Sequence, residues 1–379
     1  MDQATQLQIL QDIIKIESVN GNEAAVAEYL QRLFTQHGIE SQLIPYADGR
    51  SNLVATLPGT GDKVLGFTGH MDVVAAGDES AWLYPPFSAT IDGNKLYGRG
   101  SSDMKSGLAA MVIAMIELKD RNVSLPGTIK LLATVGEEVG EVGALQLTKA
   151  GFVEDLDALI IGEPSNYNLM YAHMGAINYH VDSLGKAAHS SMPAQGINAI
   201  SPLAEYIIAA DKAMQAITEQ YINPVLPRTI HNVTVINGGE QVNTIPGSAQ
   251  LLGNIRTIPE FDNEHVIKVL EDVVAKLNTQ PQHQLTLTID SSKAPVHADK
   301  DSSLIHAIQS VFNQPLPLVG LSANTDAAQF TKSQHHFDLV VFGPGVSTLP
   351  HKVNEYVEID NYLDMITKYQ AIVQAYFAQ

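Results

Sequence analysis

Apolar positions recur along the first half of the chain at two spacings, which predict helices and strands in alternation. Spacings of three and four predict one helix around Leu7, Leu10 and Ile14 and a second from about Asn22 to Gly38. Short apolar runs predict strands at 52–57, 64–68, 128–135 and 156–161, and a helical pattern covers 104–119. Strands alternating with helices are typical of an α/β fold with a mostly parallel sheet covered by helices.

The pattern changes near residue 175. There it reads strand, helix, strand, strand, helix, strand, which is typical of a ferredoxin-like α+β domain. These elements are predicted at 177–183, 198–218, 232–236, 249–257, 263–277 and 284–289. After Pro295 helical patterns resume, with a strand at 339–342 and a terminal helix from Asp360. We therefore expect one domain formed by 1–174 and 292–379, with a second domain, 175–291, inserted into it.

Composition narrows the class of protein. A chain of 379 residues exceeds the usual size of a single core, and 45% apolar with 17% charged residues is ordinary for a globular enzyme. The 22 basic and 41 acidic residues give a net charge of −19 without a dense basic patch, which argues against nucleic acid and anionic membrane as partners. No signal segment or membrane-length apolar run is found, so we expect a cytoplasmic protein.

The chain contains no cysteine, so imidazole and carboxylate are its only strong metal ligands. His70 follows the predicted strand 64–68, and Asp72 faces the same way if the chain stays extended. Asp72 is then placed to hydrogen-bond a metal-bound His70 ring. Asp103 lies between a glycine-rich loop and a helix, where it is either a bridging metal ligand or simply the N-cap.

Further acidic residues and a histidine also follow apolar runs. Glu137 and Glu138 come after the strand 128–135, Glu163 after 156–161, and His351 after a Gly-Pro-Gly turn. Taken singly, the glutamate pair and the histidine have an ordinary explanation as loop residues. Together, however, the residues that end parallel strands meet at the sheet edge where ligands bind in open α/β folds.

These motifs, in this order, resemble the M20-type metallopeptidase and deacylase family. That group includes succinyl-diaminopimelate desuccinylase, acetylornithine deacetylase, aminoacylase and carboxypeptidase G2. The resemblance spans about residues 65–355, and the inserted-domain layout agrees with it over the rest. It implies two zinc ions per chain, for which cobalt or manganese can substitute. One would be held by His70, Asp103 and Glu163 and the other by Asp103, Glu138 and His351.

The resemblance also implies roles for other residues. Asp72 would orient His70, Glu137 would be the general base and then acid, and a cis peptide would follow Asp103. In the inserted domain, His189 would support the oxyanion in the active site of a partner subunit, which implies a homodimer through this domain. Asn243 and Arg256 would contact the carboxylate of the substrate, although an internal ion pair is an equal explanation for Arg256.

The expected activity is hydrolysis of an amide between a small acyl group and an amino acid. Succinyl-diaminopimelate desuccinylase, an enzyme of lysine and diaminopimelate biosynthesis, is the first choice. Acetylornithine deacetylase and a di- or tripeptidase are the alternatives. A hypothesis of a different class is a non-catalytic binding module of the same fold. Such a module would have lost ligands or the base, and this chain has them all.

Overall fold

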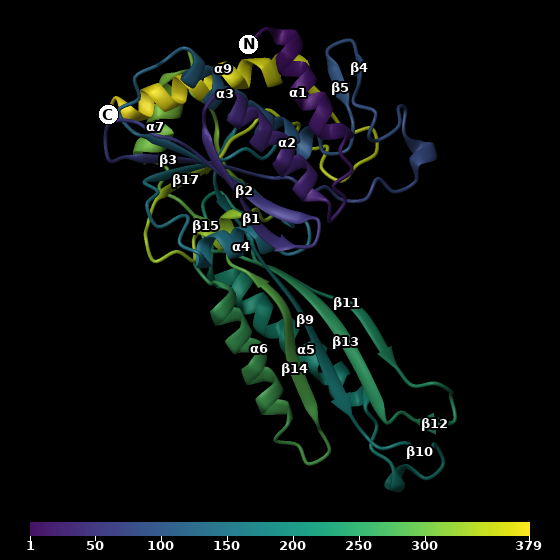
Figure 1. Cartoon of the computed structure of the whole chain (residues 1–379). Coiled ribbons are helices and arrows are strands. Elements are labelled where there is room, and N and C mark those ends of the chain that lie inside the picture. The colour runs from purple at the N-terminus through teal and green to yellow at the C-terminus, as the bar shows by residue number, and fades with distance from the viewer. The chain divides into compact units, whose positions relative to one another are not determined.

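The computed structural model describes residues 1–379, and the chain forms two units in it (Figure 1). The first unit contains Met1–Tyr171, Ala298–Val319 and Thr325–Gln379, and the second contains Ala172–His297 and Gly320–Asn324. The short segment 320–324 was not expected in the second unit. Hydrogen bonds explain it, because the Met174 N–H donates to the carbonyl of Leu321 and the Asn324 side chain donates to that of Met174.

The first unit contains most of a mixed sheet with strand order β1-β2-β6-β3-β7-β17-β8-β15, in which β16 also pairs with β8. Strand β15 and the last residues of β8 and β16 belong to the second unit. The strands are β1 Glu40–Ala47, β2 Arg50–Leu57, β3 Val64–His70, β6 Thr128–Thr134, β7 Ala158–Ile161, β8 Leu169–His173, β15 Val296–His297, β16 Leu318–Leu321 and β17 Asp338–Val341. The central four, β6, β3, β7 and β17, are parallel. The outer pairs β1/β2, β2/β6, β17/β8 and β8/β15 are antiparallel. The predicted parallel sheet is thus its centre.

Helices cover this sheet. They are α1 Gln3–Lys15, α2 Glu23–Gln36, α3 Ser106–Asp120, α4 Val142–Lys149, α7 Ser303–Ser310, α8 Ala327–Phe330 and α9 Ile359–Phe377, with a short 3₁₀ turn at Glu79–Ala81. Every residue of α3 from Ser106 to Ile116 is buried, as expected for a helix that is apolar on all sides. Because α3 contacts α9, α1 and the central strands, it fixes the turn before it, Ser101–Lys105, inside the unit.

A small antiparallel sheet with the order β18-β5-β4 completes the first unit. Its strands are β4 Thr90–Asp92, β5 Lys95–Tyr97 and β18 Tyr356–Glu358. Tyr97 pairs with Tyr356, so residues more than 250 positions apart in sequence lie next to each other. This sheet therefore joins the segment before Asp103 to the segment after His351.

The second unit has the predicted ferredoxin-like arrangement, an antiparallel sheet with order β11-β13-β9-β14. Its elements are β9 Gly175–Leu184, β10 Ala188–His189, a 3₁₀ turn Pro193–Gln195, α5 Ile200–Gln220, β11 Ile230–Gly238, β12 Thr244–Ile245, β13 Ser248–Thr257, α6 Asn263–Leu277 and β14 Leu285–Lys293. Tyr179 of β9, Tyr206 of α5 and Leu270 of α6 belong to one core, so both helices pack on the same face of the sheet.

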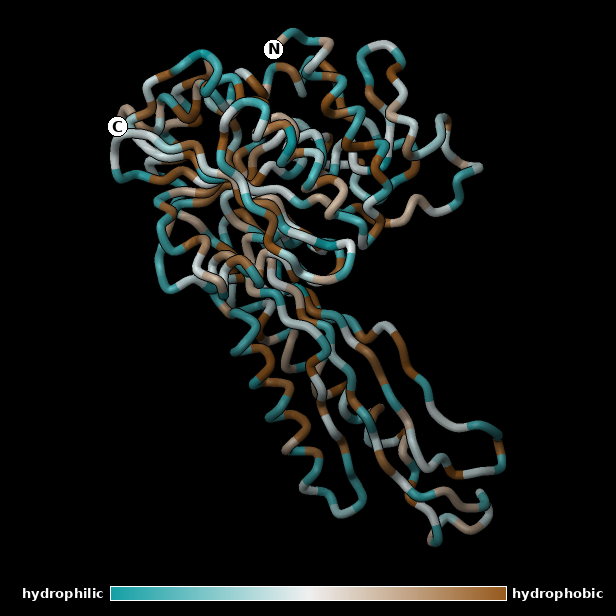
Figure 2. Tube along the Cα trace, viewed as in Figure 1, coloured by the Kyte–Doolittle hydropathy of each residue, from teal (hydrophilic) through white to brown (hydrophobic).

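The hydropathy along the trace agrees with this packing. Brown apolar and teal polar positions alternate along α6 in Figure 2, which is the pattern of a helix with one buried face. None of the helices combines the length and the apolar composition that crossing a bilayer requires.

Candidate metal centre

Neighbouring parallel strands bring a histidine and two glutamates to one edge of the sheet. His70 is the last residue of β3, and the strand register pairs it with Thr134 of β6, three residues before Glu137. On the other side of β3, β7 ends two residues before Glu163. The exposed fraction is 1% for His70 and 8% for both glutamates. The expected convergence at the carboxyl ends of these strands is present.

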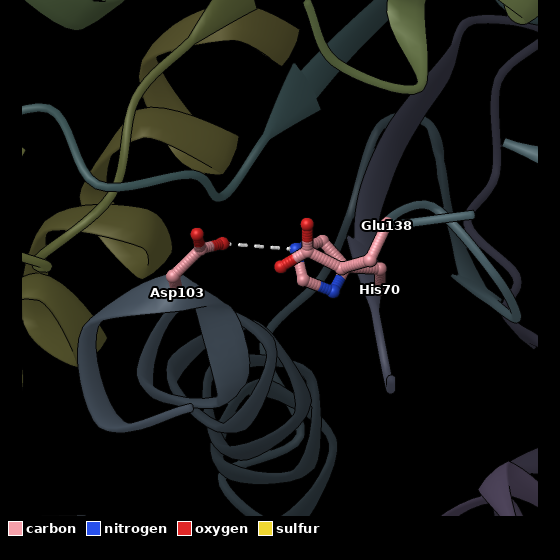
Figure 3. Close-up of side chains that lie close together, drawn as sticks. All are labelled: His70, Asp103 and Glu138. Atoms are coloured by element: carbon pink, nitrogen blue, oxygen red, sulfur yellow. Dashed lines mark hydrogen bonds and ion pairs between the residues drawn. The ribbon is translucent and has the colours of Figure 1, made fainter. Parts of the chain in front are cut away.

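Asp103 lies between two histidines. Its Oδ1 is 3.0 Å from the Nε2 of His70, and its Oδ2 is 3.6 Å from the Nε2 of His351. The backbone at Asp103 is not helical, with φ −115° and ψ 94°, and the predicted cis peptide to Met104 is present. Figure 3 shows the Asp103 side chain directed toward His70 from the segment that leads into α3. Each of its two oxygens therefore faces a different imidazole.

Two more glutamates complete two groups of side chains that share Asp103. Glu163 Oε1 lies 3.4 Å from the Nε2 of His70, and the Nε2 of His351 lies 3.0 and 3.1 Å from the oxygens of Glu138. Ligand atoms of His70, Asp103 and Glu138 all lie within 4.8 Å of one another (Figure 3). All five residues predicted as metal ligands are thus in one place.

Glycines allow the close approach that this cluster needs. A Cβ atom on Gly107, in the first turn of α3, would lie 1.9 Å from the carbonyl oxygen of Gly162. A Cβ on Gly343 would lie 2.2 Å from the same oxygen. Gly162 directly precedes Glu163, so only residues without a side chain let α3 and the loop after β17 pack against this strand end.

Asp72 lies beside His70, and its carboxylate also has partners that the sequence does not predict. The hydrogen bond of His70 Nδ1, 2.9 Å long, is to the backbone carbonyl of Asp72, while the nearest carboxylate oxygen is 3.7 Å away. The two carboxylate oxygens instead accept the backbone N–H groups of Glu137 and Glu138, both at 3.1 Å. The side chain of Asp72 thus holds the turn that carries both glutamates, and its main chain orients the imidazole.

The electrostatics of the cluster are dominated by buried negative charge. Burial raises the pKa of Glu163 to about 8 and the pKa of Glu137 well above its usual value. Burial opposes protonation of His70, but the carboxylates around it, Glu163 first, raise its pKa well above the usual value. The hydrogen bond to Glu138 raises the pKa of His351. The negative charge of the carboxylates exceeds the positive charge that two protonated imidazoles could carry. Bound cations would relieve the repulsion among the carboxylates.

Two buried carboxylates next to this centre were missed by the sequence reasoning. Glu355, which is fully buried, accepts hydrogen bonds from Arg99 and from the backbone N–H of Asp103. Burial and the nearby Asp103 charge raise its pKa to about 7. Asp326 accepts the hydroxyl of Thr134 at 2.6 Å, and burial raises its pKa to about 7. The only sequence signal was the position of Glu355 four residues after His351.

The remaining predicted residues belong to the second unit. His189 in β10 pairs with Thr244 of β12, and the Ser190 N–H donates to the carbonyl of Asn243, so His189 and Asn243 lie in neighbouring segments. Arg256, near the end of β13, donates from Nη1 to the Asn324 side chain at 2.7 Å. The internal partner of Arg256 is therefore an amide.

Comparison with known proteins agrees with this architecture. Residues 66–375 match the model of peptidase family M20/M25/M40. A probable succinyl-diaminopimelate desuccinylase of Staphylococcus epidermidis is 38% identical over 99% of this chain and 98% of its own length. An acetylornithine deacetylase of Photorhabdus laumondii is 30% identical over 85% of this chain and 82% of its own length. A solved aminopeptidase of Bacillus cereus shares the fold, with a TM-score of 0.81 and 21% identity over all of both chains.

Proposed function

Because this chain belongs to peptidase family M20/M25/M40, we propose that it uses two bound cations to remove the succinyl group from N-succinyl-diaminopimelate. Family membership makes the chain a metal-dependent hydrolase. The observation that carries the proposed dinuclear centre is the place of Asp103, with one oxygen toward His70 and the other toward His351. The choice of substrate rests on the desuccinylase relative, with which the chain aligns over nearly its whole length.

The donor atoms fit a pair of zinc ions. Tetrahedral coordination with bonds of about 2.0–2.1 Å separates neighbouring ligand atoms by about 3.3 Å. The distances from His70 Nε2 to Asp103 and Glu163 are 3.0 and 3.4 Å, and those from His351 Nε2 to Glu138 and Asp103 are 3.0 and 3.6 Å. We assign one ion to His70, Asp103 and Glu163 and the other to Asp103, Glu138 and His351. Nitrogen and oxygen ligands also accept cobalt and manganese.

Glu137 is the proposed general base. When bound, the two cations would lower the pKa of a water molecule and polarise the scissile carbonyl. Burial raises the pKa of the Glu137 carboxyl, which makes its carboxylate form a stronger base. That form would take a proton from the attacking water and return it to the departing amine. The turn held by Asp72 keeps Glu137 and Glu138 in their relative positions.

In the second unit, we propose that His189 donates to the developing oxyanion. The Ser191 N–H donates to His189 Nδ1, so a neutral ring carries its proton on Nε2 and can donate it to an oxygen. In a homodimer formed through this unit, His189 of one protomer would serve the site of the other. Asn243 and Arg256 are proposed to hold the substrate carboxylate, since a guanidinium has five N–H donors and the bond to Asn324 uses one. We expect the enzyme to act in the cytoplasm, where its small metabolite substrate would also be found.

The second candidate is acetylornithine deacetylase, supported by the relative that is 30% identical. A peptidase activity is the third. A panel of N-succinyl-diaminopimelate, N-acetylornithine and dipeptides, assayed in competition with metal-loaded enzyme, tests the order. We expect the highest kcat/KM on the succinylated substrate. Preference for N-acetylornithine or a dipeptide would reassign the enzyme, and a chain that binds no metal would favour a non-catalytic module.

A further inference from the structure

We propose that Glu355 is a positioning residue that fixes the shared carboxylate of Asp103 in register with His351. This inference rests on the proposed dinuclear function and adds a residue to it. Both carboxylate oxygens of Glu355 accept N–H groups, so we do not count Glu355 among the metal ligands. It acts through the backbone that carries Asp103.

The Glu355 carboxylate is surrounded by N–H donors. One oxygen accepts Arg99 Nη1 at 2.5 Å and the Gly100 N–H at 3.1 Å. The other accepts the N–H groups of Ser102 at 2.8 Å and of Asp103 at 3.0 Å. Glu355 is fully buried, so water does not compete for these bonds. Three backbone N–H groups in four consecutive residues therefore converge on one side chain, and the last of them belongs to Asp103.

A second set of bonds ties the same two segments together. The Ser102 hydroxyl donates to the carbonyl of Tyr356 at 2.7 Å and accepts the Val346 N–H at 2.8 Å. The Gly98 N–H donates to the carbonyl of Glu355 at 3.0 Å, next to the β5/β18 pairing. The loop before Asp103 and the segments on both sides of His351 thus form one hydrogen-bonded assembly, with Glu355 at its centre.

This assembly matters because Asp103 must serve two groups of ligands at once. Its oxygens lie 3.0 Å from His70 and 3.6 Å from His351, on opposite sides of one carboxylate. Functional side chains have to be held to within about 0.5 Å of their productive geometry. A rotation of the Asp103 backbone that improves one distance would lengthen the other. A buried side chain that accepts the N–H of Asp103 prevents that rotation.

The test is Glu355→Gln, which keeps the shape but places an NH₂ group against N–H donors on one side. The matched control is Glu117→Gln in α3, where a partly buried carboxylate accepts Gln6 and Gln370 at 2.7 and 2.8 Å, away from the centre. Metal affinity is measured by chelator competition, and the absorption spectrum of the cobalt-loaded protein reports the ligand geometry. Unfolding of the metal-free proteins is followed in parallel.

We expect Glu355→Gln to weaken metal binding about 10–100-fold and to change the cobalt spectrum, as the loss of an outer hydrogen bond to a metal ligand typically does. Glu117→Gln should leave both unchanged even if it lowers the unfolding temperature. Equal affinity and an identical spectrum in Glu355→Gln would overturn the proposal. If the wild-type chain itself bound no metal, the proposed function would fail instead, and the two failures are therefore distinguishable.

A measurement on the wild-type chain covers the case in which Glu355→Gln does not fold. If Glu355 holds the loop before any metal binds, the amides of Gly100, Ser102 and Asp103 are protected from hydrogen exchange in the metal-free protein. Fast exchange of these three amides without metal, followed by protection on metal addition, would show that the metal orders the loop. That result would also overturn the proposal.

Discussion

The contacts of Asp72 lead to a specific prediction for Asp72→Asn. The side chain of Asp72 holds the backbone N–H groups of Glu137 and Glu138, one on each oxygen, at 3.1 Å. An asparagine has one acceptor oxygen and one NH₂ group. Whichever way the amide is turned, one of the two N–H groups then faces a donor and loses its partner. The bond from His70 to the Asp72 carbonyl is a main-chain contact and survives the substitution.

The structure sets the size and the place of the effect. A hydrogen bond to a charged group contributes about 1.5–3 kcal/mol, which corresponds to roughly 10–150-fold in an equilibrium constant. Since Glu138 is on the affected turn and His70 is not, we expect this loss at the cation assigned to Glu138 and His351. The cation assigned to His70 and Glu163 should bind nearly as in the wild type.

Cobalt titration with chelator competition measures both affinities, and His70→Ala and His351→Ala identify which absorption band belongs to which site. We expect Asp72→Asn to bind one cobalt tightly and the second about 10–150-fold more weakly. Selective loss at the His70 site would show that the carboxylate acts by orienting the imidazole, as the sequence alone suggests. Equal weakening of both sites would also refute a role for the Asp72 side chain confined to the turn that carries Glu138.

Three further predictions follow from other contacts. Glu137→Gln should abolish turnover while two cations remain bound, measured by kcat and metal content, and undiminished kcat would remove Glu137 as the base. Gly107→Ala should destabilise the fold by about 1–3 kcal/mol in urea unfolding because its methyl group would meet the carbonyl of Gly162 at 1.9 Å. Gly21→Ala, with its nearest neighbour at 3.8 Å, should stay within about 0.5 kcal/mol of wild type, and equal effects of the two would contradict this. Burial lowers the pKa of His173 from 6.5 to about 4, so between these pH values the unfolded chain binds the proton more readily than the folded chain. The free energy of unfolding should therefore fall by about 3 kcal/mol as the pH drops from 6.5 to 4. His173→Gln should flatten this pH dependence in urea unfolding, and an unaltered slope would refute the role of His173.

Elements with a clear pattern were predictable from sequence. The helix expected at 263–277 has those bounds in α6, where Asp262 caps the first turn by accepting the His265 N–H. β1, Glu40–Ala47, was missed because it is an exposed strand at the sheet edge and contains a proline. β8, Leu169–His173, was missed because it is only five residues long and buried on both faces, so it shows no alternation.

The candidate site likewise contains residues that a local sequence pattern predicts and contacts that no such pattern predicts. The histidines and carboxylates that meet there were predictable because they end apolar strands or stand in compact motifs, and those positions depend on local sequence. The contacts that position them were not. The carboxylates of Glu355 and Asp72 accept backbone N–H groups. Nearly every residue has such a group, so the sequence does not indicate which of them a carboxylate will contact in the folded chain. The backbone partners of the Asp72 carboxylate therefore could not be predicted from the sequence.

The proposed dinuclear centre is tested most directly by anomalous diffraction from crystals of the zinc- or cobalt-loaded protein. We expect two peaks per chain, both within bonding distance of Asp103, one also bound by His70 and Glu163 and the other by Glu138 and His351. A single peak, or peaks that do not share Asp103, would contradict the account.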